Sequence, residues 1–376
     1  MDENKRASMK HAKLATELCI IAVAAITGAY FVGKAVRHTK DIERPPIVES
    51  AIDTEIGDTT EPVGLDSKVI YENLEVATKD KFRGELILVN NDTEYFTGNE
   101  ELVNINQQLA ADSCNVFTAN DNNMQVCQPM ITALEQLLKD FYLATNINDV
   151  VIISGYRTQD KQQQLYDDDL KKTGLDYSEL VAKPGYSEHQ TGYAVDFTTE
   201  TTWDYDGQGD YKWIDENCWK YGLILRYPED KIDLTKIKYE PWHYRYVGKC
   251  HAYFMYTNKM CMEEYMKLLK GYTYEGSHLA ITDGDGAEYE VYFVPSDDGS
   301  ETTFVPVPAN ATYDISGNNE DGFIVTVHMD DQTPITDIAE TTETETTETT
   351  EAPTEAEKQA YKAKTVKRYD RKNTFS

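Results

Sequence analysis

The sequence predicts an α+β domain, with a largely antiparallel sheet and flanking helices, followed by a small β module. Between about residues 84 and 270, helix-like and strand-like segments do not alternate regularly, which argues against a doubly wound parallel sheet. Past residue 272, β-branched and aromatic runs are separated by Asp-Gly turn signals, as in a small all-β unit. The 376 residues are enough for both parts.

The N-terminal segment combines an apolar run with flanking positive charge. Residues 18–33 hold no charged side chain, whereas lysines and arginines lie on both sides. The run is slightly shorter than the ~20 residues that cross a bilayer, and a cleaved signal peptide is the alternative interpretation. We expect residues 1–37 to hold an uncleaved, single-pass signal anchor that puts the rest of the chain on the extracellular side. Residues 38–80, acidic and with few aromatics, are expected to form a stalk.

Residues 81–271 are assigned to the α+β domain. Residues 85–90 are strand-like, and Pro129 begins a segment whose apolar residues recur at helical spacing. Residues 150–153 predict a short buried strand. A polar helix is expected over residues 160–172, with two leucines as its anchors.

Two segments of alternating residues predict the strands that matter most for chemistry. In residues 193–197 the period of two places Asp196 on the face opposite the large side chains. In residues 243–248 the same period places His243 and Arg245 on one face. Both strands are therefore expected to direct polar groups to one side of the sheet.

The remaining elements complete the domain and the module. We expect a helix around residues 211–221, a strand at 223–227 and one helix over 249–270 that closes the domain. The small β module is assigned to residues 272–330. Residues 331–376 are expected to be a Thr/Glu-rich linker and a basic disordered tail.

Charge and cysteine content limit the classes of function. The formal net charge of -30 argues against nucleic-acid binding, which needs clustered lysine and arginine. Five cysteines follow the apolar run, an odd number that cannot all pair within one chain. Cys114 and Cys127 enclose a short polar loop, and both a disulfide and buried thiols fit that spacing.

His189, Asp196 and His243 supply two imidazoles and one carboxylate, the ligands of a catalytic zinc that keeps a fourth position for water. The odd spacing of His189 and Asp196 needs a turn at Gly192 for both to reach the same metal. Glu240, three residues before His243, is placed to take a proton from that water. Although each residue alone has a structural explanation, the combination predicts metal-assisted hydrolysis.

Two neighbouring features support the predicted metal ligands and general base. Pro241 favours an extended conformation at Glu240, which prevents a helix there. Arg157 follows the strand predicted at residues 150–153, in the sequence Ser154-Gly-Tyr-Arg157. A guanidinium at this position can stabilise an oxyanion or bind a substrate carboxylate.

Three motifs carry a resemblance to a known family: Ser154-Gly-Tyr-Arg157, Ser187-Glu-His-Gln-Thr-Gly-Tyr-Ala-Val-Asp196 and Glu240-Pro-Trp-His243. They are similar to the signatures of zinc D-alanyl-D-alanine carboxypeptidases of the VanY type, which share one structural group with VanX-type dipeptidases and the hedgehog N-terminal domain. The resemblance covers about half the chain.

The resemblance implies a role for each matching residue. One zinc ion is bound by His189, Asp196 and His243, Glu240 is the general base, and Arg157 stabilises the transition state. Ser187 corresponds to a serine expected to contact substrate. The expected substrates are peptidoglycan stem peptides or precursors that end in D-Ala-D-Ala.

Three alternative functions stay open at this point. The same zinc site serves an endopeptidase that cuts cross-links or a dipeptidase, and closure of the pocket by residues 171–186 is expected to decide among them. A non-catalytic wall-binding module is the third alternative. It has no need of a general base, so Glu240 argues against it.

Overall fold

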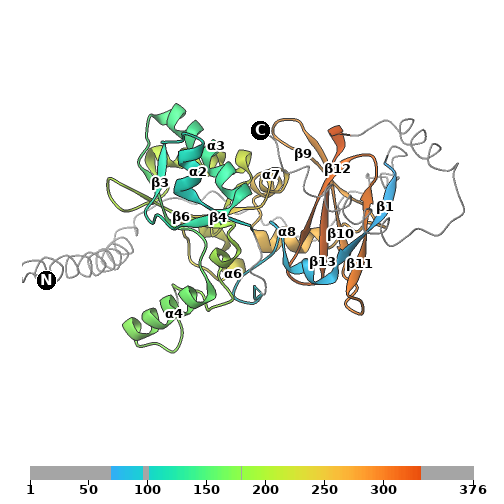
Figure 1. The fold of residues 1–376 in the computed structure, drawn as a ribbon, viewed down its shortest axis with the longest axis horizontal. Helices are drawn as coiled ribbons and strands as arrows, with labels where there is room; N and C mark the ends of the chain where they lie inside the picture. The colour runs from blue at the N-terminus through green and yellow to red at the C-terminus, as the bar shows by residue number, and fades with distance from the viewer. Residues whose placement is uncertain (1–68, 96–100, 179, 332–376) are drawn as a thin grey trace, which may run out of the picture. The chain divides into compact units, whose positions relative to one another are not determined.

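The computed structural model describes residues 69–95, 101–178 and 180–331 (Figure 1). The expected signal anchor, most of the stalk and the Thr/Glu-rich and basic C-terminal segment lie outside these ranges. No helix within the described ranges combines the length and the apolar character needed to cross a membrane.

The central sheet confirms the predicted α+β class. Its strand order is β3-β5-β6-β8-β7; β3 and β5 run parallel, and every other neighbouring pair is antiparallel. The five strands are β3 (Phe117–Ala119), β5 (Val150–Ser154), β6 (Ala194–Thr199), β8 (His243–Tyr246) and β7 (Leu223–Leu225). Because β6 is central, both of its faces are buried.

Two helices precede the strands that carry the site. Helix α3 (Gln128–Thr145) has Pro129 in its first turn and buries the expected apolar face against the sheet. Helix α4 (Gln159–Thr173) is polar, as predicted, but the two leucines expected to anchor it are only half-buried. Its one buried side chain is Gln162.

Shorter elements fill the rest of the α+β domain. The expected helix at 211–221 is divided into three pieces, and each piece is too short to be a full amphipathic helix. These elements are β2 (Leu102–Asn104), α2 (Ile105–Ala111), β4 (Gln125–Cys127), η2 (Glu188–Thr191), η3 (Gly209–Tyr211), α5 (Lys212–Asn217), η4 (Cys218–Tyr221), η5 (Glu229–Lys231) and α6 (Ile232–Thr235).

The prediction of one helix over 249–270 was wrong. The segment forms α7 (Lys249–Asn258) and α8 (Met262–Leu269), separated by Lys259 in the left-handed conformation. Glu264 accepts a hydrogen bond from the backbone N–H of Cys261 at 2.9 Å, so a capping box begins the second helix.

The strand predicted at residues 85–90 is also absent. The segment begins in a turn and is mostly buried, and its backbone bonds to side chains and to a loop carbonyl rather than to a neighbouring strand. Ser316 Oγ accepts from Leu86 N–H at 2.9 Å, and Asn319 Nδ2 donates to the carbonyl of Leu88 at 2.8 Å. The apolar pattern therefore indicated burial correctly and misjudged the hydrogen-bonding partner.

The predicted small β module contains two sheets (Figure 1). One has the order β12-β13-β10-β9 and the other pairs β1 with β11. The elements are β1 (Tyr71–Ala77), η1 (Thr78–Phe82), β9 (Leu279–Thr282), β10 (Glu288–Pro295), β11 (Thr302–Pro308), β12 (Thr312–Gly317), β13 (Gly322–His328) and η6 (Met329–Asp331).

Strand β1 corrects the expected extent of the stalk. Residues 71–77 were placed in the acidic stalk, yet they pair antiparallel with β11 along their whole length. Leu74 and Val76 pack against the core of the module. The acidic side chains of this segment, Glu72 and Glu75, are exposed to solvent although the strand is paired.

The module and the α+β domain share a hydrophobic core. Met255 of α7 and Met266 of α8 lie in one buried hydrophobic cluster with Val291 and Ile324 of the module. All five cysteines in the described part of the chain are buried, and no disulfide joins Cys114 to Cys127, which agrees with the interpretation as buried thiols.

Candidate metal centre

The structure brings the three predicted metal ligands together. His189 Nε2 lies 3.1 Å from Asp196 Oδ2, and His243 Nδ1 lies 2.9 Å from Asp196 Oδ1. One donor atom from each residue falls within 4.8 Å of the others, and all three side chains are buried. The donor set is thus preassembled from three separate elements.

Local backbone geometry explains why His189 and Asp196 meet despite their odd spacing. His189 lies in η2, which ends at Gly192 with φ +77°, and Asp196 follows on β6. A Cβ added at Gly192 would lie 2.7 Å from Cys127 Sγ and 2.8 Å from Leu102 Cδ2. Glycine is therefore required both by conformation and by space, as the predicted turn implied.

Each imidazole uses its second nitrogen for a protein partner. His189 Nδ1 lies 2.8 Å from the carbonyl oxygen of Gly155. His243 Nε2 lies 3.4 Å from Glu188 Oε2. These partners leave His189 Nε2 and His243 Nδ1 directed toward Asp196, the arrangement that orients histidine ligands in metal sites.

The three side chains differ in their electrostatics. Burial lowers the pKa of His189 to about 4, with a smaller contribution from Arg157, so this imidazole is neutral at pH 7. Burial alone would raise the pKa of Asp196, but the two histidines outweigh it and hold that pKa well below its usual range. Burial likewise opposes the charge on His243, yet hydrogen bonds to Asp196 and Glu188 raise its pKa to about 9 in the metal-free protein.

Glu240 lies at the edge of this cluster. Its Oε2 is 3.6 Å from His243 Nδ1, and its side chain is 22% exposed, so it faces both the ligands and solvent. Its backbone N–H donates to the carbonyl of Tyr227 at 3.2 Å, which fixes the segment before Pro241. Burial raises the pKa of Glu240 to about 7, which suits a group that takes and returns a proton near neutrality.

Arg157 also reaches the site. Its Nη2 donates to Asp196 Oδ2 at 3.3 Å, and its other nitrogens donate to Ser154 Oγ at 2.9 Å and Gln162 Oε1 at 3.0 Å. Gln162 is fully buried and donates in turn to the carbonyl of Ala182 at 2.8 Å. Gln162 was not identified from the sequence, because a polar residue on a polar helix gives no signal of burial.

Ser187, the expected substrate contact, lies directly before η2 and is buried. Its carbonyl accepts from Gln190 N–H at 3.0 Å, and Gln190 Oε1 accepts from Gly185 N–H at 2.7 Å. The loop before η2 is thereby tied to the turn that carries His189.

Sequence reasoning also missed a buried charge network behind the ligands. Its acidic centre is Glu188, adjacent in sequence to His189. Burial alone would raise the pKa of Glu188, but Arg226 and Arg245 reverse the effect and hold it well below its usual range. The only sequence signal was the position of Glu188 within the motif.

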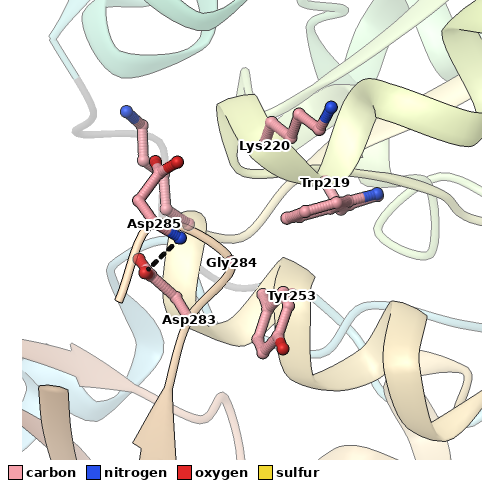
Figure 2. A pocket seen from close by; sticks show the side chains of 7 residues that line it. Trp219, Lys220, Tyr253, Asp283, Gly284 and Asp285 are labelled. Carbon is pink, nitrogen blue, oxygen red and sulfur yellow. Dashed lines mark hydrogen bonds between the residues drawn. The ribbon is translucent and has the colours of Figure 1, made fainter. Parts of the chain in front are cut away.

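A shallow pocket elsewhere shares no residue with this cluster. Trp219, Lys220 and Tyr253 line one side of it, and the turn containing Asp283 and Asp285 lines the other (Figure 2). Asp285 N–H donates to Asp283 Oδ1 at 2.9 Å within that turn. The pocket is therefore separate from the chemistry described above.

The fold and the donor set define a metal-dependent hydrolase. The family model VanY, described as D-alanyl-D-alanine carboxypeptidase, matches residues 123–249. The D-alanyl-D-alanine carboxypeptidase of Enterococcus faecium is 35% identical over 254 residues, which cover 67% of this chain and 78% of that protein. The chain therefore belongs to the VanY family of D-alanyl-D-alanine carboxypeptidases.

Two further relatives carry related activities in their names. The bifunctional D-Ala-D-Ala dipeptidase and D-Ala-D-Ala carboxypeptidase VanXYC of Enterococcus gallinarum is 41% identical over 125 residues, or 31% of this chain and 66% of that protein. A crystal structure of the vancomycin resistance D,D-dipeptidase VanXYg, in complex with a D-Ala-D-Ala phosphinate analogue, is 31% identical with a TM-score of 0.61. The alignment with VanXYg covers 69% of this chain and 99% of the VanXYg chain.

Proposed function

We propose that this protein removes the terminal D-Ala from peptidoglycan stem peptides or their precursors, in a zinc-dependent reaction. The observation that carries the proposal is the convergence of His189, Asp196 and His243 with Glu240 beside them. A general base next to three metal ligands is the arrangement of a hydrolytic site rather than a structural one.

Zinc fits the donor set. Two imidazole nitrogens and one carboxylate oxygen are ligands that zinc prefers, and three protein ligands leave one position open. The second nitrogen of each histidine is already engaged by Gly155 or Glu188, so the ligand nitrogens are predetermined. A zinc ion bound there supplies Lewis acidity, because it lowers the pKa of bound water toward ~7 and polarises a carbonyl.

The roles of the protein groups follow from their positions. Glu240 takes a proton from the water that attacks the penultimate D-Ala carbonyl and returns a proton to the departing amine. Arg157 donates hydrogen bonds to the oxyanion, and its contacts with Ser154 and Gln162 hold the guanidinium in place. Ser187 contacts the peptide next to the first ligand.

D-Ala release from a muramyl pentapeptide ending in D-Ala-D-Ala tests the proposal. The purified protein is assayed as prepared, after chelation, and after zinc is restored. Release that stops on chelation and returns with zinc supports a zinc D,D-carboxypeptidase. A protein that binds one zinc and releases no D-Ala from this substrate would refute the carboxypeptidase assignment.

Dipeptidase activity is the second candidate, because the D,D-dipeptidase VanXYg has a similar fold along nearly its whole length. The loop between α4 and η2 is anchored at Ala182 and Gly185, close to the turn that carries His189. Parallel assays on the pentapeptide and on free D-Ala-D-Ala separate the two activities. A cross-linked muropeptide in the same assay tests the endopeptidase alternative.

We also propose that residues 18–33 anchor the protein in the cell membrane with the catalytic domain outside. The support is the uncharged apolar run with basic residues on both sides. Fractionation of cells that express the full chain, or a chain beginning after residue 40, tests this anchor. Equal amounts of both proteins in the membrane fraction would contradict it.

A further inference from the structure

Glu188 is a fully enclosed carboxylate that touches one of the candidate ligands. Its side chain is 1% exposed, and its Oε2 lies 3.4 Å from His243 Nε2, at the long end of the hydrogen-bond range. Its other oxygen, Oε1, accepts from Arg226 Nε at 2.8 Å and from Arg245 Nη1 at 3.1 Å. The two oxygens therefore have different tasks, with Oε2 left for the imidazole.

Both arginines are fixed by independent parts of the fold. Arg226 forms a two-pronged pair with Glu263 of α8, with N–O distances of 2.9 and 2.6 Å. Arg245 Nη2 donates to the carbonyls of Glu85 and Ile87, at 2.9 and 3.0 Å. Since both guanidiniums are fully buried, neither they nor Glu188 has freedom to turn away.

We infer that Glu188 is a positioning residue for His243, one that keeps the proton on Nε2 and leaves Nδ1 for zinc. The inference rests on the proposed metal site. A neutral imidazole carries its proton on one nitrogen only, and an acceptor beside Nε2 keeps it there. A carboxylate behind a histidine ligand also strengthens the imidazole as a donor to the metal.

The network that holds Glu188 is balanced in charge. Two buried arginines face two buried or half-buried carboxylates, Glu188 and Glu263. Removal of either carboxylate leaves one buried positive charge without its partner, which destabilises a fold. Stability alone therefore cannot reveal the role of Glu188, and zinc affinity is the informative measurement.

Three variants of the full chain separate positioning from structural support. Glu188→Gln removes the charge beside His243. Glu188→Asp keeps the negative charge in the network but withdraws the carboxylate, from His243 Nε2 and from both arginines, by about one carbon–carbon bond. Glu263→Gln is the matched control, because it removes a charge from the same network without any contact to His243.

Zinc affinity is measured by competition with a chromophoric chelator, and thermal unfolding is recorded on the metal-free proteins. We expect Glu188→Gln and Glu188→Asp to weaken zinc binding by about 10- to 100-fold. We expect Glu263→Gln to change it by less than about threefold, although its unfolding temperature falls. If Glu188→Gln does not fold, the Asp variant alone decides.

Two results would overturn the inference: wild-type zinc affinity in the folded Glu188 variants, or an equal loss of affinity in Glu263→Gln. Either is distinct from failure of the proposed function, in which the wild-type protein itself does not bind zinc or does not release D-Ala.

Discussion

Two glycines in the left-handed conformation offer a test of how the turn at residue 192 builds the metal centre. Gly192 has φ +77° and Gly174, the C-cap of α4, has φ +70°. A Cβ at Gly192 would meet Cys127 Sγ at 2.7 Å and Leu102 Cδ2 at 2.8 Å, whereas a Cβ at Gly174 would meet no atom within 4 Å. Alanine at each position therefore imposes the same backbone strain but a different steric strain.

The expected magnitudes follow from these two contributions. The left-handed conformation costs an alanine about 1–2 kcal/mol relative to glycine at both sites. Overpacking adds about 1–3 kcal/mol at residue 192 only. We expect Gly174→Ala to lower the free energy of unfolding by about 1–2 kcal/mol and Gly192→Ala by about 2–5 kcal/mol. A difference of about 2 kcal/mol corresponds to about 2–4 °C in Tm for a chain of 376 residues, since the entropy of unfolding is about 2.1 cal/mol/K per residue.

Thermal unfolding of the two variants and of the wild-type protein measures this difference, and chelator competition measures zinc affinity. Because Gly192 ends the turn that carries His189, Gly192→Ala should also weaken zinc binding, while Gly174→Ala should not. Equal losses of stability, together with unchanged zinc affinity in both variants, would refute the argument that the turn is sterically tuned to place His189.

Three further predictions concern catalysis and pH. Glu240→Ala should retain zinc and lower kcat by about 10²- to 10⁴-fold, because general acid–base catalysis is lost. Steady-state kinetics and a zinc assay check this, and near wild-type turnover would contradict the role of Glu240 as the base. Arg157→Lys should lower kcat by about 10²- to 10³-fold, since the fixed guanidinium donors at the oxyanion are lost; a change confined to KM would instead indicate ground-state binding. Burial lowers the pKa of His251 to about 4. Its protonation therefore favours the unfolded state, and the wild-type protein should lose stability relative to His251→Gln as pH falls from 6.5 to 4, by up to about 3 kcal/mol. If the free energies of unfolding of both proteins changed equally with pH across this range, the prediction would be wrong.

The grouping of the three candidate metal ligands could be predicted because their signals are local. Asp196 lies in an alternating strand, and the turn at Gly192 and the residues around His243 are short-range features. Arg157 comes soon after the end of β5 at Ser154, so its place near the end of the sheet was also predictable. Only the distances between these groups required the structure.

The parts that sequence reasoning missed depend on distant partners. Leu86 is hydrogen-bonded to Ser316, 230 positions along the chain, and no periodicity reports such a pairing. The break between α7 and α8 occurs at Lys259, a residue that carries no glycine-like signal for a left-handed conformation. The burial of Glu188 was missed for the same reason. Its side chain is directed inward by the 3-10 turn and by two arginines that come later in the chain.

The pairing of β1 with β11 has a consequence for biosynthesis. Residues 71–77 leave the ribosome long before residues 302–308, their only strand partner in the described structure. During that interval the segment is an unpaired strand with apolar residues on one face, the kind of segment that associates with other chains. The exposed side chains of Glu72 and Glu75 supply the charge that discourages such association. The whole α+β domain is thus synthesised between the two strands of a sheet that closes only after residues 302–308 have been made.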